Sequence, residues 1–366
     1  RAAQELKTKP TQHSVKELLN SGVQPDILVC RTEKPLTQEI RKKLALFCNV
    51  NVNSVIEAID AHTIYDVPVL MKDEHLDTTV LNKLHLDHGE EPLLDAWQSF
   101  LHKLKNPSEE IRIGLIGKYI ELQDAYKSIY ESFVHAGAVN ECKVQVVGLH
   151  SEDLEKDDLV AERLAGLHGV LVAPGFGERG IEGKIRAIQY VREHKIPFFG
   201  ICLGMQCAVV EFARNVLHMQ DAASTEVSNK TAHPVIDLMS EQKTITKKGG
   251  TMRLGAYACD LVEDSHAHRA YHTDAIQERH RHRYEFNSEY LEIFESGGLR
   301  SVGTNPESGL VEIMELVGHP WFVGVQFHPE LKSTVENPHP LFVRFVEAAI
   351  RFKQGINQKR AEFQSS

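Results

Sequence analysis

A single cysteine is the best candidate nucleophile in this sequence. Cys202 lies in the stretch GICLGMQ between Gly200 and Gly204, after the apolar run IPFF and before a helical pattern with Val209 and Phe212 on one face. A sharp turn from strand to helix exposes a nucleophile at the carboxyl edge of a sheet. The helix N-terminus favours the reactive thiolate and offers N–H groups to an oxyanion. A lone cysteine is usually a small core residue, but this setting predicts a nucleophile.

A thiolate needs a base, and the stretch QFHPE supplies a candidate. His328 and Glu330 follow an apolar strand and are two residues apart, so in extended backbone both side chains point to the same side. The imidazole can move a proton and the carboxylate can orient it. A surface His-Pro-Glu is unremarkable alone, but with Cys202 it predicts a Cys-His-Glu triad. The upstream turn APGFGERG (173–180) either donates an oxyanion N–H or is an ordinary loop.

The elements around these residues alternate between strand and helix. Strand patterns occur at IRIGLIG, KVQVVGLH, GVLV and IPFFGI, with helical patterns of about 10–15 residues between them. This alternation predicts an α/β fold with a mostly parallel sheet. From about Glu226 the pattern changes to shorter, hairpin-like strands, followed by the strand WFVGVQF and a final helix, PLFVRFVEAAIRF.

The chain divides at the polar, proline-containing stretch KNPSEE. We expect one domain over 1–105, a linker over 106–110, a second domain over 111–354 and a loose tail over 355–366. In the first domain QPDILVCRT reads as a strand. A helix follows with Thr37 as its N-cap, and residues 76–104 read as helical.

Composition narrows the function classes. The chain has 366 residues and a net charge of −10, which argues against general nucleic-acid binding. No stretch approaches the ~20 apolar residues of a membrane span. Six cysteines without C-x-x-C spacing indicate free thiols in a reducing cytoplasm. Residues 1–43 carry nine Lys/Arg against five Asp/Glu, a basic patch able to hold a small polyphosphate.

Together the Cys202, His328 and Glu330 motifs and the PGFG turn resemble class I glutamine amidotransferases. The phrases LIGKYIELQDAYKSIYE, CLGMQCAVVEFARNVL, ERHRHRYEFN and HPWFVGVQFHPE, with ELKTKPTQHSVKELLNSGVQPDILVCR upstream, are similar to the CTP synthase family. The resemblance covers nearly all of the chain. It implies an amidotransferase domain preceded by the C-terminal portion of an α/β, P-loop-like synthetase domain.

The resemblance implies a role for each matching position. Cys202 attacks the side-chain amide of glutamine, His328 shuttles the proton, and Glu330 orients His328. The implied glutamine-binding and oxyanion residues are Gly175, Leu203, Gly204, Met205, Gln206, Glu226 and Arg283. The backbone N–H groups of Gly175 and Leu203 form the oxyanion hole. The family usually reads P-G-G-F-G where this chain reads APGFG, but Gly175 keeps its place.

The resemblance also implies nucleotide partners. The implied UTP/CTP-binding residues are Lys7, Thr8, Lys9, Pro10, Thr11, Gln12 and Lys43. The short stretch KTKPTQ is expected to be a loop whose lysines suit a triphosphate. The family reaction is the ATP- and Mg²⁺-dependent amination of UTP to CTP with ammonia from glutamine, activated by GTP in a homotetramer. The family's ATP site lies upstream of KTKPTQ, so this chain is expected to lack it and to be unable to complete the reaction.

Two alternatives stay open. The first is the glutaminase of another amidotransferase, such as that of GMP synthetase, although KTKPTQHS argues against it. The second is a non-catalytic remnant that only oligomerises or binds nucleotide. A metal site at the histidine-rich stretches HAHRAYH and RHRHR is set aside. Because no cysteine or acidic ligand set accompanies these histidines, we predict no metal. GLIGKY lacks the spacing of a phosphate-binding loop.

Overall fold

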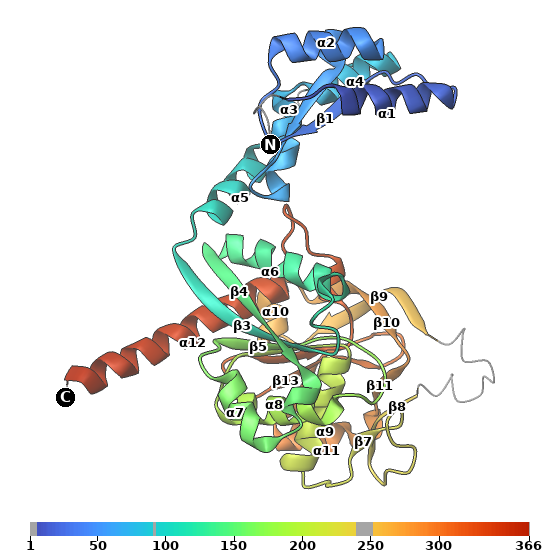
Figure 1. Ribbon diagram of the computed structural model, residues 1–366. Coiled ribbons are helices and arrows are strands. Elements are labelled where there is room, and N and C mark those ends of the chain that lie inside the picture. The colour runs from blue at the N-terminus through green and yellow to red at the C-terminus, as the bar shows by residue number, and fades with distance from the viewer. Residues whose placement is uncertain (1–5, 91–92, 239–251, 366) are drawn as a thin grey trace. The chain divides into compact units, whose positions relative to one another are not determined.

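The computed structural model describes residues 6–90, 93–238 and 252–365 (Figure 1). The chain forms two compact units, Arg1–Leu101 and His102–Ser366. No helix among the described residues is long and apolar enough to cross a membrane. Each unit has its own hydrophobic core.

The first unit is built on two parallel strands, β1 (Leu28–Thr32) and β2 (Val55–Ile59). Its helices are α1 (Lys9–Asn20), α2 (Gln38–Cys48), α3 (Val67–Asp73) and α4 (Leu76–Leu84). The core consists of Val15, Leu28, Leu44, Ala45, Cys48 and Val55. The predicted N-cap is confirmed, since the Thr37 hydroxyl accepts a hydrogen bond from the Ile40 N–H.

Two expectations for this unit were wrong. The helical stretch predicted over 76–104 is two helices, α4 and α5 (Asp95–Lys105). The stretch Lys7–Gln12 is not a loop, because α1 begins at Lys9 and Thr8 occupies its N-cap position. Pro10 in the first turn favours this helix start, since its fixed φ suits a helix and its missing N–H has no partner there.

The second unit is an α/β fold on a nine-stranded sheet in the order β10-β9-β12-β13-β14-β6-β5-β3-β4. The predicted parallel part is confirmed and consists of β3 (Glu109–Gly117), β4 (Cys142–His150), β5 (Gly169–Val172), β6 (Phe198–Ile201) and β14 (Phe322–Val325). The antiparallel part consists of β9 (Arg253–Leu261), β10 (Ala275–His282), β12 (Leu299–Thr304) and β13 (Val311–Leu316). A separate small sheet contains β7 (Ala223–Ser224), β8 (Pro234–Leu238) and β11 (Tyr284–Phe286).

Helices cover both faces of this sheet (Figure 1). One core packs α8 (Ile181–Glu193) and α9 (Leu203–Asn215) on residues such as Val170 and Val172. The opposite core packs α6 (Lys127–Val139) and α12 (Pro340–Ser365) on residues such as Leu171 and Phe199. The remaining helices are α7 (Asp157–Leu164), α10 (His266–Tyr271) and α11 (Leu291–Gly297). Because α12 continues to Ser365, helix replaces the tail expected at 355–366 as far as that residue.

Candidate active site

The turn from β6 to α9 has the geometry expected of a nucleophile elbow. Cys202 has φ 52° and ψ −103°, in the left-handed region that side chains normally avoid. A Cβ at Gly204 would lie 2.2 Å from the Val172 carbonyl oxygen, and one at Gly200 would lie 2.8 Å from the Gly204 carbonyl carbon. Both flanking glycines are therefore needed for close contact between helix and strands.

His328 and Glu330 meet directly, although not through extended backbone as predicted. The chain leaves β14 and forms a short 3₁₀ turn, η8 (Pro329–Leu331), which brings Glu330 Oε1 to 2.7 Å from His328 Nδ1. The backbone N–H of His328 donates a hydrogen bond to the backbone carbonyl of Arg279 at 2.8 Å. Both side chains are buried. This arrangement fixes the ring and assigns the Nδ1 proton to the bond with Glu330.

The surroundings of His328 favour its protonated form. Burial by itself lowers the pKa of His328, but the neighbouring Cys202 sulfur and the Glu330 carboxylate outweigh burial and raise the pKa to about 10. Since an imidazolium is stabilised by negative charge, the geometry supports a thiolate–imidazolium pair flanked by a carboxylate.

The three residues share a cleft of about 380 Å³ with Pro174, Gly175 and Phe176. Among the described residues, no acceptor pairs with the backbone N–H of Gly175 or Leu203. A Cβ at Gly175 would lie 3.4 Å from Leu203 Cδ2, so the two backbone segments are neighbours. Two N–H groups beside the nucleophile are thus available to an oxyanion.

Two lysines that the sequence reasoning missed hold the glycine turn. Lys118 Nζ donates to the carbonyls of Phe176 and Gly177 at 2.5 and 2.8 Å. Lys184 is completely buried, and its Nζ lies 3.4 Å from the Ala173 carbonyl oxygen. Burial lowers the pKa of Lys184 to about 8. Lys118 directly follows a strand end, a signal that could have identified it.

The predicted glutamine-binding residues lie around the same elbow. Leu203, Gln206 and Glu226 line a second cavity, and Glu226 Oε1 accepts from the Gly177 N–H at 3.0 Å. Gln206 is buried, and its Nε2 donates to the Tyr284 carbonyl at 2.9 Å. Arg283 is partly buried between β10 and β11. Gly204 and Met205 are buried in the first turn of α9 and line neither cavity.

The predicted nucleotide residues lie in the first unit. The side chains of Lys7, Lys9 and Lys43 are exposed, the last on α2. Thr8 is buried, and its hydroxyl accepts from Gln12 Nε2 at 3.1 Å. Pro10 and Thr11 belong to the first turn of α1. The exposed ammonium groups can contact phosphate, whereas Thr8 and Gln12 stabilise the helix start.

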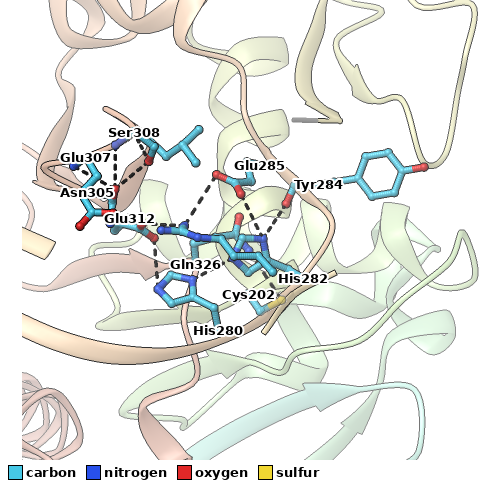
Figure 2. Close-up of polar contacts among 12 residues, drawn as sticks. Cys202, His280, His282, Tyr284, Glu285, Asn305, Glu307, Ser308, Glu312 and Gln326 are labelled. Atoms are coloured by element: carbon cyan, nitrogen blue, oxygen red, sulfur yellow. Dashed lines mark hydrogen bonds and ion pairs between the residues drawn. The ribbon is translucent and has the colours of Figure 1, made fainter. Parts of the chain in front are cut away.

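Sequence reasoning also missed Gln326 and a buried charged cluster near Cys202 (Figure 2). Gln326 Nε2 lies 3.7 Å from Cys202 Sγ. The charged cluster contains Arg253, His280, His282, Glu285 and Glu312, all buried. The motif RHRHRYE made the two histidines recognisable in the sequence. Arg253 and Glu312, which complete the cluster, come from β9 and β13, which lie elsewhere in the sequence.

Two family sequence models match the chain. Glutamine amidotransferase class-I matches residues 121–348, and CTP synthase N-terminus matches residues 1–86. A CTP synthase of Cytophaga hutchinsonii is 64% identical over 354 residues, 97% of this chain and 66% of that protein. A CTP synthase of Bacteroides fragilis is 58% identical over 349 residues, 95% of this chain and 65% of that protein. The chain therefore spans just under two thirds of these relatives' length.

A solved structure of the glutaminase domain of Trypanosoma brucei CTPS with bound acivicin is also similar. Its sequence is 36% identical, the TM-score is 0.63, and the match covers 66% of this chain and 94% of that one. The matched fold is that of the second unit, in which the Cys202 cleft lies.

Proposed function

Because the chain belongs to the class I glutamine amidotransferase family, we propose that it carries the glutaminase half of a CTP synthase, a ligase of pyrimidine nucleotide biosynthesis. The observation that carries the proposal is the buried group of Cys202, His328 and Glu330, with 2.7 Å between His328 Nδ1 and Glu330 Oε1. Identity to CTP synthases over 97% and 95% of the chain supports the choice among amidotransferases.

The first chemical step is attack by the Cys202 thiolate on the side-chain amide carbon of glutamine. The carbonyl electron pair moves to oxygen, and the N–H groups of Gly175 and Leu203 stabilise the oxyanion. His328 then donates its proton to the amide nitrogen, and the C–N bond breaks. Ammonia leaves, and a glutamyl thioester remains on Cys202.

The second step is hydrolysis of the thioester. Neutral His328 accepts a proton from water, the resulting hydroxide attacks the thioester carbon, and the C–S bond breaks. Glutamate leaves, and the thiolate–imidazolium pair is restored. Glu330 holds the Nδ1 proton of His328 throughout, so that Nε2 exchanges protons with the cleft.

Glutamine recognition follows from charge. We assign Glu226 to the α-ammonium and Arg283 to the α-carboxylate of glutamine, because each is the oppositely charged partner. Residues 203–206 complete this site through the first turn of α9. The same elbow thereby positions both the nucleophile and the substrate.

The nucleotide half of the reaction is assigned by resemblance. Lys7–Gln12 and Lys43 contact UTP or CTP, with the exposed lysines on the phosphates. In the complete reaction ATP and Mg²⁺ activate UTP, GTP is an allosteric activator, and the enzyme is a homotetramer. All six cysteines are free in the structure, which fits a cytoplasmic protein.

The proposal is tested with acivicin, used as an electrophilic glutamine analogue. We expect one covalent adduct, which peptide mass spectrometry places on Cys202, and loss of glutamate release from glutamine. Cys202→Ala should abolish both, whereas Cys30→Ala, which removes a thiol in the first unit, should change neither. Labelling of another cysteine, no labelling, or glutamate release that survives Cys202→Ala would overturn the assignment.

A further inference from the structure

A chain of hydrogen bonds reaches the Cys202 sulfur from the side of the buried charged cluster (Figure 2). Its last member is Gln326, which directly follows β14 and is fully buried. Gln326 Nε2 lies 3.7 Å from Cys202 Sγ, within hydrogen-bond distance for sulfur. The Cys-His-Glu mechanism gives this amide no task, although it touches the reacting atom.

The orientation of the Gln326 amide follows from one backbone carbonyl. The Tyr284 oxygen can only accept, so the Gln206 atom 2.9 Å from it must be the donor, Nε2. The same Nε2 lies 3.2 Å from the Gln326 oxygen, Oε1. Since Oε1 occupies that end of the Gln326 amide, Nε2 must face Cys202. A flipped amide would place two N–H groups against each other and an oxygen against the thiolate.

The same carbonyl also orders two histidines. His282 Nδ1 lies 3.3 Å from the Tyr284 oxygen and therefore carries a proton. Its Nε2 then accepts from His280 Nδ1 at 2.8 Å. Burial lowers the pKa of His280 to about 2 and that of His282 to about 3, which keeps both rings neutral. The Tyr284 carbonyl, which determines the orientation of the Gln206 and Gln326 amides, therefore also accepts a hydrogen bond from His282.

The far end of the histidine chain meets a carboxyl group. His280 Nε2 is left as an acceptor and faces Glu312 Oε2 at 3.5 Å, while Glu312 Oε1 accepts from Arg253 at 2.7 Å. Within the described part of the chain, neither His280 Nε2 nor Glu312 Oε2 has a hydrogen-bond partner, and burial raises the pKa of Glu312 to about 7, so a proton on Glu312 faces an open acceptor. From His280 Nδ1 to Gln326 every hydrogen bond in the chain then has a defined donor and acceptor.

We propose that Gln326 is a further catalytic residue that donates its amide N–H to the Cys202 sulfur and stabilises the thiolate, with Gln206 and His282 as positioning residues. The inference rests on the proposed role of Cys202 as nucleophile. His328 gives its proton to the leaving amide nitrogen in the first step, and it is neutral when water approaches the thioester. An amide cannot lose its proton in this way, so Gln326 stabilises sulfur charge at both stages.

The test is the rate of Cys202 alkylation by iodoacetamide as a function of pH in the whole chain, measured by peptide mass spectrometry. Gln326→Met keeps the side-chain length without the donor, and Gln326→Glu replaces the donor with a carboxylate. Each should move the midpoint of the Cys202 alkylation profile up by about one pH unit, which slows alkylation about tenfold at pH values below the parent midpoint. Gln206→Met should move the midpoint in the same direction by less.

Cys30, which is partly exposed in the first unit, is the internal reference and should react at an unchanged rate. Gln145→Glu makes the same chemical change at an exposed position of β4 and should leave the Cys202 profile unchanged. Circular dichroism identifies the folded variants. Should Gln326→Met not fold, Gln326→Glu and Gln206→Met decide the question.

Two negative outcomes are distinguishable. Unchanged Cys202 profiles in all folded variants would overturn the role of Gln326 and leave the proposed function intact. A parent protein in which Cys202 reacts no faster than Cys30 at pH 7 would instead contradict the proposed nucleophile.

Discussion

At Cys202 the requirements of chemistry and of backbone conformation conflict. The φ of 52° is one that glycine adopts freely, whereas a Cβ in this region creates strain of about 1–3 kcal/mol. A residue with a side chain is nonetheless present, because only the thiolate performs the reaction. The strain is maintained by close packing of α9 on β5 and β6, where Gly200 and Gly204 leave no space for a Cβ.

This conflict predicts the relative stability of two inactive variants. Cys202→Gly and Cys202→Ala should both abolish glutaminase activity. Glycine relieves the strain, so Cys202→Gly should be the more stable by about 1 kcal/mol, despite the greater freedom of glycine in the unfolded chain. Equilibrium denaturation with urea measures the difference.

The control is the same exchange at an exposed helical position. Ala161→Gly on α7 should destabilise the protein by about 1 kcal/mol, which is the opposite order. Equal stabilities for Cys202→Gly and Cys202→Ala, or greater stability of the alanine variant, would show that the turn is not strained.

Some site residues could be predicted and others could not, because the two groups differ in how local their signals are. Cys202, His328 and Glu330 each stand in a short motif whose chemistry is evident. Gln326 stands in QFHPE, but its orientation depends on Gln206, 120 residues away, and on the carbonyl of Tyr284. No periodicity in the sequence predicts such a contact.

At the scale of elements, the antiparallel half of the nine-stranded sheet and strand β11 of the small sheet bring buried charged groups together. Arg253 comes from β9, His280 and His282 from β10, Glu285 from β11 and Glu312 from β13. Arg253 is near two buried carboxyl groups, those of Glu285 and Glu312. Its single positive charge offsets only part of the free-energy cost of burying two carboxylates. Burial raises the pKa of Glu285 to about 8 and that of Glu312 to about 7.

These raised pKa values predict that stability falls as pH rises. The folded state binds more protons than the unfolded chain from about pH 4.5 to 8, since a free glutamate titrates near 4.3. The resulting stabilisation is complete below that range and is lost as pH rises through about 7 and 8. Each linked proton changes the free energy of unfolding by about 1.4 kcal/mol per pH unit.

Glu312→Gln tests this linkage, because glutamine still accepts from Arg253 and can donate to His280 without titrating. The fall in Tm between pH 6 and 8 should be smaller in this variant than in the parent protein. Glu162→Gln, at an exposed position of α7, should keep the parental pH dependence. A parental pH dependence in Glu312→Gln would rule out Glu312 as a contributor.

Helices and strands were predicted best where apolar residues follow a clear pattern along the sequence. The alternation of strand and helix around β3, β5 and β6 was evident because buried parallel strands read as continuous apolar runs. The end of α12 was not predicted, since polar composition suggested a tail where the helix continues. The turn at Pro329 was also missed, because a strand pattern does not show where the chain bends.

At the scale of the whole molecule, the two units differ in the size of their cores. The first unit packs a two-stranded sheet on the small cluster around Leu44 and Val55. The second unit packs helices on both faces of nine strands. Since stability grows with the apolar area buried, the units should unfold separately, the first one first.

Hydrogen exchange followed by mass spectrometry should show this order. Peptides from β1 and β2 should lose protection at lower urea than peptides from β3, β5 and β6. CTP, which we propose binds through Lys7 and Lys43, should stabilise the first unit alone, by about 2.7 kcal/mol at a hundred times its Kd. Lys7→Ala with Lys43→Ala should remove that stabilisation.

Core substitutions in each unit separate the two transitions. Leu44→Ala, in the core of the first unit, should lower the protection of β1 and β2 only. Leu115→Ala, on β3, should lower protection in the second unit only. Each substitution should reduce the free energy of unfolding of its own unit by about 2–5 kcal/mol. Both leucines are buried, so the loss of volume is matched. A shift of both transitions by either substitution would mean that the two units unfold as one cooperative structure, and the difference in core size would then not control the order of unfolding.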